Sequence, residues 1–311
     1  MARWVIRFGP IGRARRCLDR HSGGMTHQPM PDPRHSDRAL LVNVFSNGPG
    51  GGNPAPVVVD ARGLDGDAMR RIAARSGHES AFVLPGRDSS DYHFRFFVPN
   101  HEMEMCGHAT LGAVWLLDQL GRLASKDISI MTLSGPVEAR VDGGQARISQ
   151  PKGWCNTVED DGAVLDVLGL QPSDLFDYPL QNAATSRVKT LVPLRSVEIL
   201  DGLRPDFSRV ARVCDQIGST GLYPFALVDD KAAIFSARQF PRSSGYPEDA
   251  ATGIAATALA WSAWELGLTS QHRVVVRQGE AMGRPSRITI EREGDRCWLS
   301  GDVELIGEMP L

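Results

Sequence analysis

The segment GHATLGAVWLLDQLG at residues 107–121 is echoed by GIAATALAWSAWELG at residues 253–267. Both segments open and close on Gly, and both place a Trp at the same internal position, Trp115 in the first and Trp261 in the second. An internal repeat of half a chain is typical of two similarly built domains rather than of a solenoid. The sequence therefore predicts a molecule made of two related halves.

Each repeated segment is apolar on nearly every side, which indicates a helix buried at the centre of a domain. The closing glycines suit the left-handed position that ends many helices. The N-terminus of such a helix carries free N–H groups and the positive end of the helix dipole, so two such ends facing one cleft would bind an anion. Ordinary core helices are the alternative. The anion-binding cleft is favoured by the polar residues near both N-termini, which are Cys106, His108, Thr110, Glu248, Asp249 and Thr252.

The composition is that of an ordinary globular protein. The 311 residues are 42% hydrophobic and 23% charged, which is enough for two domains. A formal net charge of -3 argues against a nucleic-acid partner, and no apolar run is long enough to span a membrane. Five cysteines without a CxxC pair indicate neither a disulfide framework nor a metal site, so we expect a cytoplasmic protein.

The domain organisation follows from the repeat and from changes in composition. Residues 1–36 begin with five Arg in sixteen positions, and we expect them to be a disordered or dispensable extension. We then expect a first domain at residues 37–150 and a second at residues 151–295. Residues 296–311 should hold a terminal strand that could pair in either domain.

Strand and helix patterns fill both predicted domains, although residues 151–236 are the least legible. Besides the two central segments, residues 65–76 have an acidic start and a Gly77 stop, and residues 207–217 also predict a helix. The Gly-rich residues 46–52 lack the ending of a P-loop, so we interpret them as a turn that lets the backbone approach a ligand. Strands are predicted at residues 39–45, 57–59, 81–84, 92–98, 128–133, 137–141, 146–148, 190–193, 225–228, 233–236, 273–276 and 286–291.

Glu79 stands at the start of an apolar strand, where a carboxylate has little structural use. A solvated loop position is the alternative, because most Glu side chains are exposed. A carboxylate in a cleft can take up and return a proton, and we therefore single out Glu79 as a candidate acid and base.

Five motifs, in this order along residues 39–311, resemble the phenazine-biosynthesis isomerase (PhzF-like) family. They are GNP at residues 52–54, ESAFV at 79–83, CGHAT at 106–110, GYPEDAATG at 245–253 and QGEAMGRPS at 278–286. The resemblance implies the α+β fold of diaminopimelate epimerase. That fold has two pseudo-symmetric domains, each a curved, mostly antiparallel sheet around a central helix, with the active site between them.

The same resemblance implies a cofactor-independent isomerase that moves a proton between carbons of a small cyclic or unsaturated amino acid. Its catalytic residues would be Glu79, His108 and Asp249. A substrate carrying a carboxylate would be the partner, neither a metal nor a cofactor is expected, and a homodimer is possible. The implied substrate-binding residues are Asn53, Ser80, Cys106, Gly107, Ala109, Thr110, Thr252, Gly253 and Ile254.

Three other functions stay open at this point. A racemase or epimerase of the same fold would need a second thiol at Thr252 to work with Cys106, whereas a Cys and Thr pair resembles related hydroxyproline dehydratases. A non-catalytic binding protein is the third possibility, since fold does not fix function. Ile254 replaces a Ser of the phenazine isomerase, which puts the same substrate in doubt.

Overall fold

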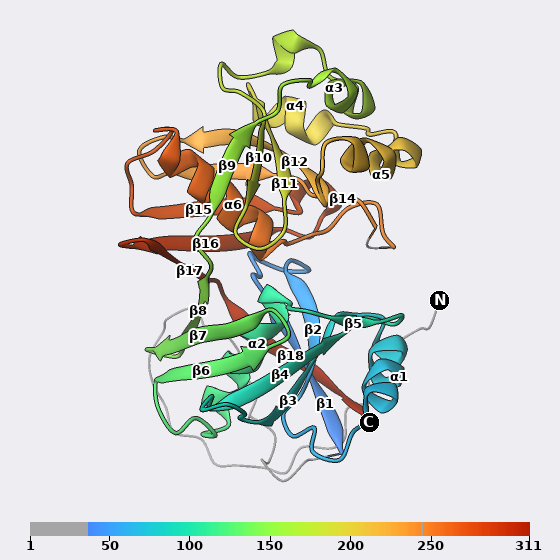
Figure 1. Cartoon of the computed structure of the whole chain (residues 1–311), viewed down its shortest axis with the longest axis vertical. Coiled ribbons are helices and arrows are strands. Elements are labelled where there is room, and N and C mark those ends of the chain that lie inside the picture. Colours follow the sequence, from blue (N-terminus) through green and yellow to red (C-terminus); the bar gives the residue numbers. More distant parts are fainter. Residues whose placement is uncertain (1–36, 244) are drawn as a thin grey trace, which may run out of the picture.

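The computed structural model describes residues 37–243 and 245–311, so the predicted extension at residues 1–36 lies outside the described residues. Figure 1 shows two stacked halves, with the blue to green strands below and most of the yellow to red strands above. No helix in the described part has the length and apolar composition that crossing a bilayer requires.

Nine strands belong to the lower half. They are β1 (Arg38–Val44), β2 (Asn53–Val58), β3 (Ser80–Pro85), β4 (Tyr92–Phe97), β5 (Glu102–Met103), β6 (Asp127–Thr132), β7 (Gly135–Asp142), β8 (Gln145–Gln150) and β18 (Val303–Pro310). The upper half holds the other strands of the described residues. They are β9 (Trp154–Thr157), β10 (Gln181–Ala184), β11 (Lys189–Leu194), β12 (Gly221–Asp229), β13 (Ile234–Ala237), β14 (Phe240–Pro241), β15 (Arg273–Gln278), β16 (Ser286–Glu293) and β17 (Arg296–Ser300).

The two halves share one strand topology. The lower sheet runs β18, β1, β2, β3, β4, β6, β7 and β8, and only the β2–β3 and β4–β6 pairs are parallel. The upper sheet runs β9, β10, β11, β12, β13, β15, β16 and β17, and only the β11–β12 and β13–β15 pairs are parallel. The predicted α+β fold of two pseudo-symmetric, mostly antiparallel sheets is confirmed.

Each sheet surrounds one of the two predicted central helices. The helices of the described residues are α1 (Gly66–Ser76), α2 (Gly107–Gln119), α3 (Gly162–Leu168), α4 (Val197–Gly202), α5 (Phe207–Gln216) and α6 (Gly253–Glu265), with 3₁₀ turns at Pro172–Asp174 and Glu280–Met282. Helix α2 packs on β1, β2 and β8, and α6 packs on β9, β10 and β16. Gly121 and Gly267, which follow these helices, have φ values of 62° and 76°, as expected for left-handed ends.

The repeat extends to a matching cluster of side chains in each half. Arg95 forms a bidentate ion pair with Glu102 and lies over the Phe97 ring, 5.1 Å from its centroid. Arg238 repeats this arrangement with Glu248 and with Phe240, at 5.0 Å. Each Arg lies in or directly after a strand, and each Glu lies in the segment between that strand and the central helix. The ion pair therefore fixes the segment that leads to the helix.

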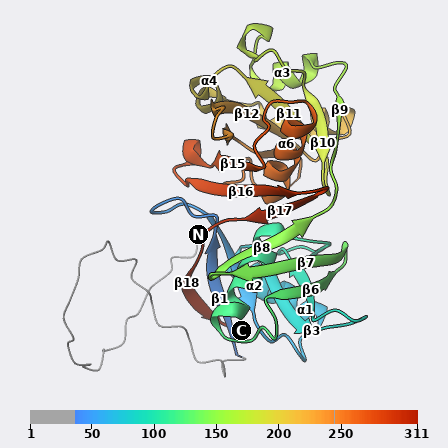
Figure 2. The same ribbon diagram turned by 90° about the vertical axis from the view of Figure 1, so that its left-hand side faces the viewer.

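The end of the chain connects the two halves. Strand β17 pairs with β16 of the upper half and with β8 of the lower half, and β18 then pairs with β1. Figure 2, turned by 90°, shows β18 beside β1 below and β17 near the boundary between the halves. The predicted tail strand is therefore two strands, while the predicted boundaries at residues 150 and 295 stay a prediction.

The remaining differences from the sequence pattern have local causes. The strand predicted at residues 57–59 begins earlier, because Asn53 and Pro54 already belong to β2. The strand tolerates Pro54 because β3 pairs only with Val57 and Val58, so no second neighbour needs the missing N–H. The short β5, β9, β10, β14, α3 and α4 were not predicted. Strand β10 reads QNAA, which has little strand propensity of its own.

Candidate active site

Two adjoining cavities lie where the halves meet. We call the larger one, with a volume of about 1160 Å³, the outer cavity. The smaller one, of about 400 Å³, is called the inner cavity. Glu79 from the lower half and Asp249 from the upper half line both cavities. The two carboxyl groups therefore belong to the walls of both cavities.

The N-termini of both central helices reach the inner cavity. Gly107 and His108 line it from α2, and Gly253 and Ile254 line it from α6. The two starts are close because both pack against Leu299: a Cβ on Gly107 would lie 3.4 Å from Leu299 Cδ2, and one on Gly253 would lie 2.6 Å from it.

The N-caps of these two helices differ from most others in the chain. Asp65, Ser196 and Asp206 each accept a bond from the helix that they precede. Cys106 and Thr252, the caps of the central helices, make no such bond. The first N–H groups of α2 and α6 are therefore available to an anion in the inner cavity.

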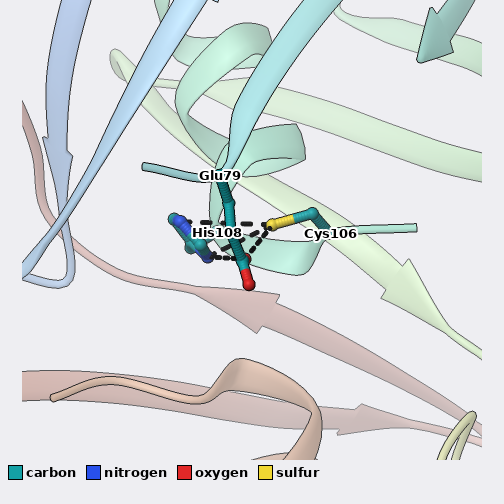
Figure 3. Close-up of side chains that lie close together, drawn as sticks. All are labelled: Glu79, Cys106 and His108. Carbon is teal, nitrogen blue, oxygen red and sulfur yellow. Dashed lines mark hydrogen bonds and ion pairs between the residues drawn. The ribbon is translucent and has the colours of Figure 1, made fainter. Parts of the chain in front are cut away.

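Glu79, Cys106 and His108 form one cluster, in which the three side chains point toward one another (Figure 3). The Cys106 thiol donates to Glu79 Oε2 at 3.0 Å, and its sulfur lies 3.3 Å from His108 Nδ1. His108 Nδ1 is 3.7 Å from the same carboxylate oxygen. The Glu79 side chain is 24% exposed, so a ligand in the cavities can reach it.

The composition of the cluster is compatible with proton transfer and with metal binding. Its three potential ligand atoms lie within 4.8 Å of one another, which is compatible with a metal ion. Burial raises the pKa of the Cys106 thiol well above its usual value, and the charge of Glu79 adds to the increase. A protonated Cys106 serves as a hydrogen-bond donor to Glu79.

Asp249 is held by donors from both halves. Asn53 Nδ2 donates to Oδ1 at 3.2 Å, and Thr252 Oγ1 donates to Oδ2 at 2.5 Å. Burial raises the pKa of Asp249, and the bond from Thr252 opposes that increase. Gln278 fixes the backbone behind it by donating to the Asp249 carbonyl at 2.8 Å, and Tyr223 donates to Gln278 at 2.8 Å.

Three of the predicted binding residues do not line either cavity. Ser80, Ala109 and Thr110 are all fully buried. The Ser80 hydroxyl donates to the His78 carbonyl, and the Thr110 hydroxyl donates to the Cys106 carbonyl. Their side chains support the local backbone, while the other predicted residues surround the two cavities.

Several polar residues at the inner cavity were not predicted from the sequence, among them Arg187, which lines both cavities. Lys189 and Gln239 line the inner cavity, and Gln278 supports Asp249 behind its wall. Gln278 opens the QGEAMGRPS motif, so that motif was the available signal. Lys189 begins the otherwise apolar β11 and belongs to none of the motifs, so the sequence held no signal for it.

Comparisons with known proteins show which family the chain resembles. The family model for phenazine biosynthesis-like proteins (PhzC-PhzF) matches residues 42–308. An isomerase without further characterisation from Deinococcus radiodurans is 33% identical over 82% of this chain and 87% of its own length. The trans-2,3-dihydro-3-hydroxyanthranilate isomerase of Pseudomonas aeruginosa is 31% identical over 83% of this chain and 91% of its own. A PhzF-family structure from Bacillus anthracis has a TM-score of 0.78 at 25% identity, covering 88% of this chain and 98% of that one.

Proposed function

The chain belongs to the phenazine biosynthesis-like family and is an isomerase, and on that premise we propose that Glu79 moves a proton between two carbons of a small cyclic or unsaturated amino acid. The carboxylate takes a proton as one C–H bond breaks, and the electron pair delocalises over the unsaturated system. The same carboxyl group then returns the proton to a second carbon. The substrate is isomerised with no net gain or loss of atoms.

The observation that carries this proposal is the position of Glu79 between the two cavities, beside a thiol that stays protonated. Cys106 donates to Glu79 and is not itself a thiolate base. Thr252, at the matching position of the other half, donates to Asp249. A two-thiol racemase mechanism therefore lacks its second thiol, and Glu79 is the proton carrier of this proposal.

The other groups of the inner cavity have binding roles in this proposal. The N–H groups that open α2 and α6, at Gly107 and Gly253, hold the substrate carboxylate and stabilise charge as it develops. Asp249, fixed by Asn53 and Thr252, orients the substrate. The proposed reaction needs no cofactor.

The identity of the substrate need not be that of the Pseudomonas aeruginosa relative. Ile254 lines the inner cavity where the resemblance gives the phenazine isomerase a Ser. An apolar side chain cannot donate a hydrogen bond to a substrate hydroxyl. We therefore propose a substrate that shares the carboxylate but lacks a polar group facing Ile254.

The test is hydrogen exchange from heavy water, followed by mass spectrometry over a panel of cyclic and unsaturated amino acids. Glu79→Gln should lower turnover by about two to four orders of magnitude and leave binding within about tenfold. Glu104→Gln is the matched control, since it makes the same chemical change at another residue of the inner cavity. Full activity in Glu79→Gln would show that the proton travels through another group, with His108 the first to examine.

A further inference from the structure

Lys189 is a buried cation without an ion-pair partner. The residue is 5% exposed, begins β11 and lines the inner cavity. Within residues 37–243 and 245–311 no carboxylate pairs with its ammonium group, and Asp249 and Glu79 act on it only through longer-range attraction. Burying an unpaired charge is unfavourable. The inner cavity therefore holds a positive charge whose partner is not supplied by the described protein.

The shared topology gives Lys189 a counterpart in the other half. Strands β2 and β11 occupy equivalent places in the two sheets. Val58 lies beside Phe82, which pairs with Arg95, and Val192 lies beside Pro224, which accepts a bond from Arg238, so Val58 and Val192 are equivalent. Three residues earlier, the upper half presents the cation of Lys189 where the lower half presents the methyl group of Ala55.

Gln239 is a second unpartnered polar side chain at the same cavity. It follows Arg238 as Phe96 follows Arg95, so the repeat has an apolar ring in one half and an amide in the other. Gln239 is 1% exposed, and neither its amide nitrogen nor its amide oxygen has a partner among the described residues. Two polar groups of the upper half therefore lack partners at one wall of the inner cavity.

We propose that Lys189 binds a second acidic group of the substrate, so that the substrate class is a small acid with two anionic groups. One group is held at the N-termini of α2 and α6, and the other pairs with the Lys189 ammonium group. The inference deepens the proposed function and rests on it in taking the inner cavity as the substrate site. Burial lowers the pKa of Lys189 to about 8, so the side chain is still mainly protonated at neutral pH.

The test compares small acids with their amides by titration calorimetry. The pairs are L-glutamate and L-glutamine, L-aspartate and L-asparagine, and phthalate and phthalamate, so each pair differs only in the second carboxylate. Wild-type protein should bind at least one acid more tightly than its amide by about 10- to 100-fold, the range for a hydrogen bond to a charged group. Lys189→Met should abolish that preference and leave binding of the amide within about threefold.

Two controls separate recognition from a structural effect. Lys126→Met removes the same charge from a side chain that is 78% exposed, and it should behave as wild type. Without ligand, Lys189→Met should unfold at a higher temperature than wild type, because an unpaired buried charge is gone. A lower unfolding temperature would indicate a structural lysine and would count against the proposal.

Two binding results would overturn the inference. Either no acid of the panel binds more tightly than its amide, or Lys189→Met weakens acid and amide equally. The outcome is separable from that of the proposed function, because binding is measured without turnover. Glu79→Gln should keep the preference for the acid while losing hydrogen exchange. A preference without any exchange in wild type would remove the isomerase mechanism but leave this inference standing.

Discussion

The chain holds two similar Arg–Glu ion pairs that differ in how far their side chains are buried. Arg238 and Glu248 have side chains that are 8% and 10% exposed, whereas Arg95 and Glu102 are 25% and 24% exposed. Arg238 Nη1 also donates to the carbonyl of Leu200 at 3.1 Å. Removing the buried Arg would leave a carboxylate and carbonyl groups without donors.

From this difference we expect Arg238→Met to lower the free energy of unfolding by about 3–5 kcal/mol, the range for breaking a buried pair. Arg95→Met should cost about 1 kcal/mol, because water can solvate Glu102 once it is unpaired. Urea unfolding followed by tryptophan fluorescence measures both. Adding Glu248→Gln to Arg238→Met should recover part of the loss. Equal losses in the two single variants would refute the reasoning, since burial would then not decide the effect.

Three further predictions concern the active site. Cys106→Ser should keep most of its turnover on the substrate found in the exchange screen, and a loss of more than about a thousandfold would restore the racemase mechanism. Asp249→Asn should weaken substrate binding and turnover together, because Asp249 orients the substrate; steady-state kinetics with a changed turnover number alone would contradict that role. The pKa of Lys189 is about 8 in the folded protein against 10.5 in its ordinary state. Between pH 8 and pH 10.5 the unfolded chain therefore binds more protons than the folded protein. The free energy of unfolding should rise with pH over this range by up to about 3 kcal/mol. This rise is expected in wild type but not in Lys189→Met.

Most of the architecture could be predicted from the sequence, because the repeat is clearest in the two buried central helices. The two central helices begin at Gly107 and Gly253 as the repeat indicated, and they are apolar on all sides because each is surrounded by a sheet. The short elements β9, α3, β10 and α4, between residues 151 and 202, escaped prediction. Strand β9 is largely exposed, so no alternation of burial marks it.

The site residues that belong to sequence motifs could be predicted, whereas those that only the packing brings to the site could not. Glu79, His108 and Asp249 were indicated by position and resemblance, and they line the cavities. Lys189 was missed because a single Lys in an apolar strand gives no signal by itself. Its place became apparent only through the pairing that makes β11 the counterpart of β2.

The return of β18 to the lower half has a consequence for biosynthesis. Domains of a nascent chain usually fold in order from the N-terminus. Here β1 cannot gain its partner β18 until Val303–Pro310 has left the ribosome, after the whole upper half has been made. Until then one edge of β1 in the lower half is unpaired, whereas the upper half can complete its own sheet first. The pairing of β18 thus completes the lower sheet only after the upper half has been synthesised.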